Sequence, residues 1–422
     1  MINALYDAYR VLFKVYSDGA FVKQAINDTP IEELNRAHTV KLCYGVLDKD
    51  IELSYYLSVL CDKNPKQAIR IILKESFYAI KYLKTAPYAV VDNAVELTKK
   101  LGKGGNAGFV NAVLRKFTKT QIELPKDEFG RLSVEYSYPE WLVKNLVESY
   151  GKERSVSIMS ADTERTSVRF NDGTDGEKYL SDHRWSYEKT PFDNCFFVKG
   201  FKRDEDFDNG VYTFQSIGSV AICDVVGRGG NLLDACAAPG GKSVNLADKF
   251  DKITACDVHE HRVNLIKEYA GRMGKTNITA INKDSSFFDE NSVEKFDAVL
   301  CDVPCSGTGV MKDNPDVKLN RTAENVKELN ITQEKILSVC SKYVKKGGYL
   351  VYSTCSVLKS ENQDIIKKFL TENADFKEVT IDSPLPHERI EVGLNFFPDI
   401  YFGAGFFVCK LQKVNKWKSY RI

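Results

Sequence analysis

The chain has 422 residues, too many for one ordinary hydrophobic core, so two or three domains are expected. With 43% hydrophobic and 28% charged residues and a net charge of +1, the composition is that of a soluble globular protein. No run of about 18 apolar residues predicts a membrane span, and the N-terminus lacks the layout of a signal peptide. We therefore expect a cytoplasmic protein without a membrane partner.

The cysteines and histidines exclude two further kinds of site. Eleven cysteines in an intracellular chain of this size favour reduced thiols over a disulfide framework. They form no Cys-x-x-Cys pair, and the five histidines sit in no ligand spacing, so we expect no metal.

Residues 1–130 predict helix after helix, because apolar residues recur at helical spacing and no β alternation interrupts them. We expect an all-α domain here. Its helices are a first one that carries Ala4, Leu5, Ala8, Leu12 and Val15, then Ile31–Leu47, Pro65–Leu83, Tyr88–Leu101 and Ala107–Phe117.

The stretch Leu97–Lys126 is strongly basic. Its only acidic residue is Glu123, against Lys99, Lys100, Lys103, Arg115, Lys116, Lys119 and Lys126. Such a run is typical either of a solvated helix surface or of a patch that faces phosphates. Charge alone does not decide between the two.

A mixed segment follows. Leu124-Pro125 begins a connecting stretch, and Pro139-Glu140-Trp141 opens a new helix. Helix-like Glu153–Ser160 precedes two strand-like runs, Thr166–Phe170 and Cys195–Val198. We interpret residues 139–207 as a small α/β linking subdomain.

Residues 208–422 alternate apolar runs with helical stretches, which is the rhythm of a doubly wound parallel sheet of the Rossmann-like class. A late strand, Gly405–Leu411, closes it. The apolar runs are Asn231–Cys236, Ile253–Cys256, Ile278–Ile281, Ala298–Cys301 and Tyr349–Tyr352.

Two cysteines follow apolar runs directly, Cys305 in Asp-Val-Pro-Cys-Ser-Gly-Thr-Gly and Cys355 in Tyr-Ser-Thr-Cys-Ser-Val. A parallel strand that ends this way delivers a thiol to the carboxyl edge of the sheet, where open α/β sheets bind ligands. One such thiol is commonly a packed core residue, but two at the same edge indicate chemistry. The cysteines inside apolar runs or helices are expected to be core residues: Cys43, Cys61, Cys236, Cys256, Cys301 and Cys340.

A glycine-rich loop joins the first of these strands to a helix, in the run Leu232–Ser243. It ends in Gly-Lys-Ser like a P-loop, but Cys236 stands where that motif needs a glycine, so the P-loop interpretation fails. A tight turn remains, in which small residues let a ligand lie against the backbone. Asp234 and Lys242 are its charged groups.

Acidic residues follow the next strands. Asp257, Asp284 and Asp302 come after the second, third and fourth strands. Any one alone is usually a loop-solvating residue, but in register at one sheet edge they describe a nucleoside-shaped cleft, in which Asp257 is placed to bind ribose hydroxyls.

These motifs resemble those of the RNA cytosine-C5 methyltransferases: Asp234–Lys242, Asp302–Gly309 and Thr354–Val357. Leu42–Leu47 and Gly108–Arg115 resemble the NusB-type RNA-binding domain of the bacterial small subunit methyltransferase B group. The resemblance covers nearly the whole chain. It implies a class I S-adenosylmethionine methyltransferase domain, preceded by an all-α NusB-like domain and the small α/β linking subdomain.

The resemblance also implies roles for single residues. Asp257 would hold the ribose and Asp284 the adenine of S-adenosylmethionine. Asp302 would also contact S-adenosylmethionine. Together with Pro304 and Cys305, it would form the side of the cleft that receives the target base. The loop that would hold the methionine moiety consists of Cys236, Ala237, Ala238, Pro239, Gly240, Gly241 and Lys242.

The chemistry needs one thiolate, because carbon 5 of cytosine becomes nucleophilic only after a thiolate adds to carbon 6. DNA enzymes use a Pro-Cys cysteine, which would point to Cys305, but RNA enzymes use the Thr-Cys loop. We therefore expect Cys355 to attack, Cys305 to assist release, and Asp302 to protonate or hydrogen-bond the ring nitrogen at position 3.

Two motifs depart from the family pattern. Ser216 stands in Gln-Ser-Ile-Gly-Ser where Gln-Asp-x-Ala-Ser is usual, and Ala404 stands where Asp-Gly-Phe-Phe is common. Both concern the wall of the cleft.

The resemblance implies methylation of a specific cytosine in small-subunit (16S) ribosomal RNA, by a monomer that contacts this RNA through the helical domain. Two alternatives stay open: the same chemistry on transfer RNA or another ribosomal cytosine, and a non-catalytic RNA-binding assembly factor.

Overall fold

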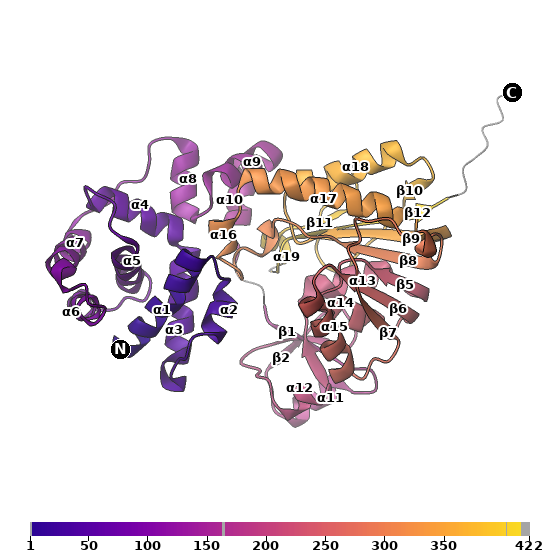
Figure 1. The fold of residues 1–422 in the computed structure, drawn as a ribbon, viewed down its shortest axis with the longest axis horizontal. Helices are drawn as coiled ribbons and strands as arrows, with labels where there is room; N and C mark the ends of the chain where they lie inside the picture. The colour runs from indigo at the N-terminus through magenta and orange to yellow at the C-terminus, as the bar shows by residue number, and fades with distance from the viewer. Residues whose placement is uncertain (1, 163–164, 402, 415–422) are drawn as a thin grey trace. The chain divides into compact units, whose positions relative to one another are not determined.

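The computed structural model describes residues 2–162, 165–401 and 403–414. The chain forms two compact units (Figure 1). Unit 1 contains residues 1–160 and 311–322, and unit 2 contains residues 161–310 and 323–422. In the described part of the chain, no helix is both long and apolar enough to cross a bilayer.

Unit 1 is helical, which confirms the all-α fold expected for the first part of the chain. The apolar faces of its helices, among them α1, α3 and α5, share one core. The helices are α1 (Ile2–Asp18), α2 (Val22–Asn27), α3 (Glu33–Asp48), α4 (Asp50–Leu60), α5 (Gln67–Lys81), α6 (Pro87–Lys100), η1 (Gly104–Asn106), α7 (Ala107–Lys119), α8 (Glu128–Tyr136), α9 (Glu140–Tyr150), α10 (Lys152–Ser160) and α16 (Val317–Asn320).

Four of these α-helices, α2, α4, α8 and α16, were not expected. We interpreted the stretch around α8 as a connection, but Asp127 caps that helix by accepting a hydrogen bond from the Gly130 backbone N–H. Ser137, in the left-handed conformation, ends it.

Residues 311–322 belong to unit 1 although they follow the Cys305 motif in the chain. Their anchor is Lys318, whose side chain is fully buried and donates to Asp48 Oδ1 at 2.6 Å and to the Asp48 carbonyl at 3.0 Å. Burial lowers the pKa of Lys318 to about 8, against the opposing charge of Asp48. The Tyr138 ring lies 4.5 Å from the same ammonium group.

Unit 2 begins with a small antiparallel sheet in the order β2-β3-β1-β4. An aromatic core fills it. Its elements are β1 (Ser167–Phe170), α11 (Gly176–Asp182), β2 (Tyr187–Lys189), β3 (Cys195–Val198), α12 (Glu205–Asp208) and β4 (Tyr212–Phe214). The division into three domains, at 1–130, 139–207 and 208–422, stays a prediction. The structure adds that α9 and α10 lie in unit 1, and residues 415–422 lie outside the described part.

The large sheet has the order β10-β12-β9-β8-β5-β6-β7, with β11 beside β12. Five strands, β9-β8-β5-β6-β7, are parallel, as expected. The closing strand β12 runs antiparallel to β9, so the sheet is mixed. The strands are β5 (Gly229–Asp234), β6 (Phe250–Asp257), β7 (Ile278–Asn282), β8 (Phe296–Asp302), β9 (Val344–Thr354), β10 (Phe376–Glu378), β11 (Leu394–Phe396) and β12 (Phe406–Lys413).

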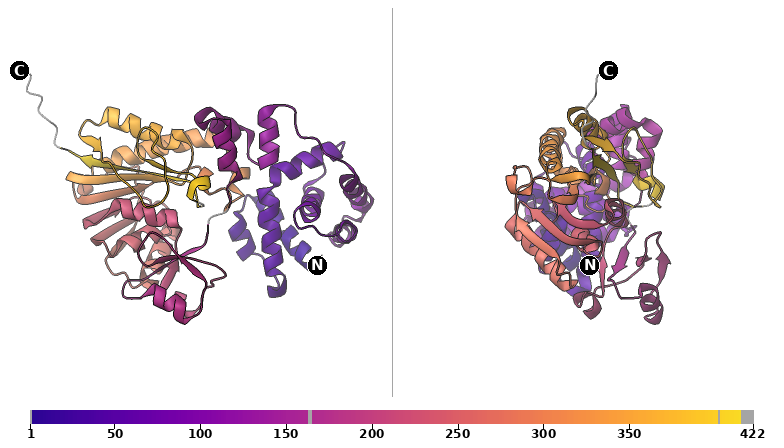
Figure 2. Two further views of the ribbon diagram at one scale, coloured as in Figure 1. Left: turned by 180° about the vertical axis from the view of Figure 1, so that it is seen from behind. Right: turned by 90° about the vertical axis from the view of Figure 1, so that its right-hand side faces the viewer.

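Helices cover both faces of this sheet (Figures 1 and 2). Leu232 packs with α13, α14 and α15 on one face, and its neighbour Leu233 packs with α17 and α18 on the other, as alternation along a strand requires. The remaining elements are α13 (Ile217–Val226), α14 (Gly241–Leu246), α15 (Glu260–Arg272), η2 (Glu290–Ser292), η3 (Thr308–Val310), α17 (Ala323–Ser341), η4 (Lys359–Glu361), α18 (Gln363–Glu372) and α19 (Pro398–Tyr401).

The parallel strands β5, β6, β8 and β9 end at one edge of the sheet, in Asp234, Asp257, Asp302 and Thr354. The glycine-rich loop and both cysteine loops leave from this edge, so the fold brings the three motifs together.

Candidate active site

The glycine-rich loop makes a tight turn between β5 and α14. The backbone N–H of Ala237 donates to the Cys256 carbonyl at 2.8 Å, and that of Gly240 donates to the Ala237 carbonyl at 2.8 Å. Gly240 has φ +108°, and a Cβ there would lie 3.2 Å from Ile266 Cα. Glycine is therefore required at this position, both for its conformation and for space.

A cavity of about 200 Å³ lies against this loop. Both the loop and the end of β8 line it, and Asp234 lines it from the end of β5. The expected site residues in its wall are Cys236, Ala237, Ala238, Pro239, Gly241, Lys242 and Asp302. Cys236 is half-buried, whereas the other cysteines expected in the core are buried.

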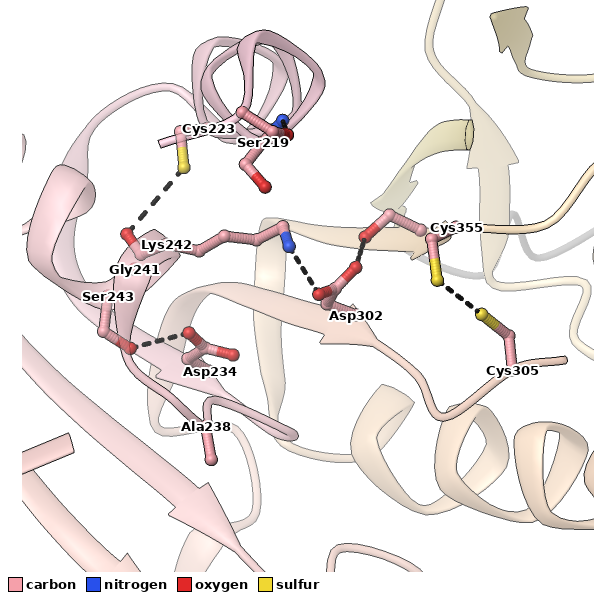
Figure 3. A network of polar contacts seen from close by, with 12 residues as sticks. Ser219, Cys223, Asp234, Ala238, Gly241, Lys242, Ser243, Asp302, Cys305 and Cys355 are labelled. Atoms are coloured by element: carbon pink, nitrogen blue, oxygen red, sulfur yellow. Dashed lines mark hydrogen bonds and ion pairs between the residues drawn. The ribbon is translucent and has the colours of Figure 1, made fainter. Parts of the chain in front are cut away.

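Asp234 is buried and incompletely paired. Its Oδ2 accepts a hydrogen bond from Ser243 Oγ at 2.6 Å, while its Oδ1 has no hydrogen-bond partner among the described residues (Figure 3). Burial raises the pKa of Asp234 to about 6, against the lowering effect of the Ser243 hydroxyl. An unpaired carboxylate oxygen in a cavity wall fits a ligand with a cationic N–H group.

Two further expected carboxylates lie at the same sheet edge. Asp257, at the end of β6, is buried and accepts from the His259 backbone N–H at 3.1 Å, and its Oδ2 lies 3.3 Å from Arg262. Arg262 also donates to the Ala238 carbonyl, so it ties Asp257 to the glycine-rich loop. Asp284 follows β7 and accepts from the Ser286 backbone N–H.

Lys242 and Asp302 form an ion pair of 2.6 Å (Figure 3). Ser353 Oγ donates to the other Asp302 oxygen at 2.7 Å. Burial alone would lower the pKa of Lys242, but the charge of Asp302 and its hydrogen bond outweigh burial and raise the pKa. Lys242 is therefore a stable cation beside the Asp302 carboxylate.

A second cavity, of about 210 Å³, shares Lys242 and Asp302 with the first one. Cys355 lines it from the end of β9. Two of the positions that depart from the family pattern, Ser216 and Ala404, also belong to its wall. The ion pair thus stands between two adjoining cavities, one at the glycine-rich loop and one at Cys355.

The two candidate cysteines are in contact, with 3.1 Å between their Sγ atoms (Figure 3). The hydrogen bond from the Cys305 thiol lowers the pKa of Cys355, against burial and the charge of Asp302, and Lys242 adds to the lowering. The same bond and burial raise the pKa of Cys305 well above its ordinary value. The contact therefore favours ionisation of Cys355 over ionisation of Cys305.

Several residues that hold this site were not expected from the sequence. Gln215 Nε2 donates to the Gly241 carbonyl at 3.1 Å, and its Oε1 accepts from Arg169 of the small sheet at 2.8 Å. Ser353 positions Asp302, and Glu361 lies beneath the Cys305 loop. Gln215 is the first residue of the Gln-Ser-Ile-Gly-Ser motif, but nothing in the sequence indicates a role for Glu361.

The chain was compared with known protein families and with solved structures. Residues 227–412 match the 16S rRNA methyltransferase RsmB/F family, and residues 3–119 match the NusB family. A relative from Bacillus subtilis, described as a probable ribosomal RNA small subunit methyltransferase B, is 33% identical over 96% of this chain and 98% of its own length. The chain belongs to the ribosomal RNA small subunit methyltransferase B family.

Membership in this family confirms that the chain is an S-adenosylmethionine-dependent methyltransferase with an N-terminal NusB domain. A second member, from Pasteurella multocida, is 30% identical over 96% of this chain and 95% of its own length. The solved structure of PH0851 shares the fold across 98% of both chains, with a TM-score of 0.83 and 23% identity. A methyltransferase homologue from Pyrococcus horikoshii matches 67% of this chain and 98% of its own, with a TM-score of 0.60 and 24% identity.

Proposed function

We propose that this chain methylates carbon 5 of a specific cytosine in small-subunit (16S) ribosomal RNA, through a covalent bond between Cys355 and carbon 6 of the base. The observation that carries the proposal is the contact between the Cys355 and Cys305 sulfurs beside the Lys242–Asp302 pair. The names of the family members support the RNA substrate. We further propose that the enzyme acts as a monomer in the cytoplasm and without a metal ion.

The glycine-rich loop and its acidic neighbours would hold S-adenosylmethionine, which supplies an electrophilic methyl group when bound. Asp257 would accept hydrogen bonds from the ribose hydroxyls, and Asp284 would contact the adenine. The unpaired oxygen of Asp234 would accept from the methionine ammonium group. The loop residues Cys236–Lys242 would enclose the methionine moiety, so that its methyl group faces the second cavity.

The target cytosine would occupy the cavity that Cys355 lines. The Cys355 thiolate forms a bond to carbon 6, and the ring electrons move to nitrogen 3. As negative charge develops on nitrogen 3, Asp302 takes up a proton from solvent and donates a hydrogen bond to this nitrogen, while Lys242 stays protonated beside it. Carbon 5 then forms a bond to the methyl carbon, while the bond from that carbon to the donor's sulfur breaks.

Release would use Cys305. Its high pKa results first from the hydrogen bond to Cys355 and from burial, and the Cys355 charge adds to it. Once Cys355 is bonded to carbon 6, that charge is gone, so Cys305 loses its proton to solvent more readily. The Cys305 thiolate takes the proton from carbon 5, the C5–C6 double bond re-forms, and Cys355 leaves as a thiolate. The proton at nitrogen 3 returns through Asp302 to solvent.

The RNA around the target would contact the basic patch at the end of α6 and on α7. Lys99, Lys103 and Arg115 are exposed, and Phe109 is 39% exposed beside the glycine-rich turn between these helices. Positive groups with an exposed ring are typical of RNA surfaces. Both faces of the target base must be free, so the base must leave its stack.

The test is incubation of the full chain with labelled S-adenosylmethionine and unmodified 16S ribosomal RNA, followed by mapping of 5-methylcytosine. Cys355→Ala should abolish both methylation and denaturant-resistant RNA adducts. Cys305→Ala should block turnover but accumulate the adduct. Cys61→Ala, which alters a thiol of the helical unit, is the control.

The reverse behaviour of the two cysteine variants would overturn their assignment. Methylation of transfer RNA or large-subunit RNA in place of 16S RNA would contradict the proposal that 16S RNA is the substrate. Binding of S-adenosylmethionine with no methyl transfer to any of these RNAs would leave a non-catalytic RNA-binding protein.

A further inference from the structure

Glu361, the last residue of η4, is a fully buried carboxylate close to the Cys305 loop. Its Oε1 accepts from the Ser306 backbone N–H at 2.8 Å and from Gln333 Nε2 at 3.0 Å, and its Oε2 accepts from Ser306 Oγ at 2.5 Å. A buried charge is costly unless several hydrogen bonds compensate it. The residue next to Cys305 provides two of these bonds.

Gln333, on α17, holds the other side of Cys305. Its side chain is fully buried, and its Nε2 also donates to the Pro304 carbonyl at 2.9 Å. The residues before and after Cys305 are therefore fixed by one pair of contacting side chains, Gln333 and Glu361. This pair leaves the Cys305 backbone little freedom to move away from Cys355.

A second set of hydrogen bonds joins the Cys305 loop to the Cys355 loop. Thr308 Oγ1 lies 2.9 Å from Ser356 Oγ, and Ser306 Oγ, whose own proton goes to Glu361, lies 3.2 Å from the Thr308 hydroxyl and 3.4 Å from that of Ser356. The Gly309 backbone N–H donates to the Cys355 carbonyl at 3.0 Å. Because Glu361 accepts from Ser306, it holds the hydroxyl from which this bridge between the loops begins.

Charge gives Glu361 a second effect. After the hydrogen bond to Cys355, burial and the charge of Cys355, the Glu361 carboxylate is the next factor that raises the pKa of Cys305. At Cys355 the same carboxylate is the weakest of the named influences, and Lys242 counters it there. Glu361 accepts from the residue next to Cys305, so its negative charge opposes ionisation of that thiol.

We propose that Glu361 is a positioning residue of the site formed by Cys305 and Cys355. It holds the Cys305 loop against Cys355, and its charge keeps Cys305 protonated, so that Cys355 is the thiol that attacks. This inference rests on the proposed function, because it presupposes that Cys355 attacks and Cys305 assists release. Glu361 is not among the residues that line either cavity, and it acts through Ser306, Gln333 and Cys305. No bond to the substrate is made or broken at this residue.

The test compares Glu361→Gln with wild type in the full chain. The amide keeps the shape and one acceptor oxygen but loses the charge, so Cys305 competes with Cys355 for the ionised state. We expect single-turnover formation of the RNA adduct to slow by about tenfold or more, with unchanged affinity for S-adenosylmethionine and RNA. The pH at which the adduct decays at half its maximal rate should move lower. Glu372→Gln, exposed on α18, is the matched control.

Ser306→Ala is the second variant, should Glu361→Gln fail to fold. It removes one bond to the carboxylate but keeps the charge, so the adduct should form and decay more slowly with an unchanged pH profile. Wild-type adduct kinetics and pH dependence in a folded Glu361→Gln would overturn the inference. In that case the cysteine variants would still trap or lose the adduct as proposed. If Cys355→Ala still forms adducts, the proposed function itself fails.

Discussion

The replacement Asp234→Asn should weaken the binding of S-adenosylmethionine and remove its dependence on pH. The pKa of Asp234 is about 6, and its Oδ1 has no hydrogen-bond partner among the described residues. An ammonium group binds the carboxylate and not the protonated acid, and the ionised fraction falls about tenfold between pH 7 and pH 5. The affinity of wild type should therefore fall by about tenfold, or ~1.4 kcal/mol, over this range.

Calorimetric titration of the full chain with S-adenosylmethionine, at several values between about pH 5 and pH 7, measures this effect. Losing a charge-assisted hydrogen bond, worth about 1.5–3 kcal/mol, should weaken binding to Asp234→Asn about 10- to 150-fold at pH 7, with little change on acidification. Asp251→Asn, exposed at the start of β6, should behave like wild type. If wild type binds equally well at both ends of the range, or if Asp234→Asn keeps the slope, Asp234 does not accept from the ammonium group.

Two further predictions concern the helical unit. Both carboxylate oxygens of Glu75 are buried without hydrogen-bond partners among the described residues, and burial raises its pKa well above 4.5. The Glu75 carboxyl ionises only in the unfolded chain, so wild type loses stability as the pH rises. The free energy of unfolding of Glu75→Met should therefore exceed that of wild type by a difference that grows by about 1.4 kcal/mol per pH unit above about pH 4.5. Hydrogen exchange of the α5 amides measures it, and a constant difference would contradict the reasoning. Replacing Lys103, Arg115 and Lys116 by Ala should weaken RNA binding. The slope of the logarithm of the binding constant against the logarithm of the salt concentration should become less steep by about 0.7–0.9 per lost phosphate contact. An unchanged slope would exclude phosphate contacts there.

The sequence placed the motifs at one sheet edge because each apolar run ends where its strand ends. Cys305 and Cys355 follow β8 and β9, neighbouring parallel strands, and this adjacency brings their Sγ atoms to 3.1 Å. The direction of β12 could not be predicted, because a strand buried on both faces shows no alternation that distinguishes parallel from antiparallel pairing.

Which cysteine ionises more readily could not be predicted from residue order. It depends on a hydrogen bond between two loops and on the distance to Lys242, which comes from a third loop. Glu361 escaped prediction for a similar reason. Its partners, Ser306 and Gln333, lie far from it in the sequence, and an acidic residue in a polar stretch ordinarily indicates an exposed surface.

The inclusion of residues 311–322 in the helical unit has a consequence for dissecting this enzyme. A truncated chain that starts at residue 161 would still carry Lys318, but without Asp48 and Tyr138, which bury its ammonium group. The excised methyltransferase unit would thus keep residues 311–322 without the helices that they pack against, and this segment begins a few residues after Cys305. Each unit consists of two separate segments of the chain. A chimera that exchanges the helical unit between relatives would therefore have to exchange residues 311–322 as well.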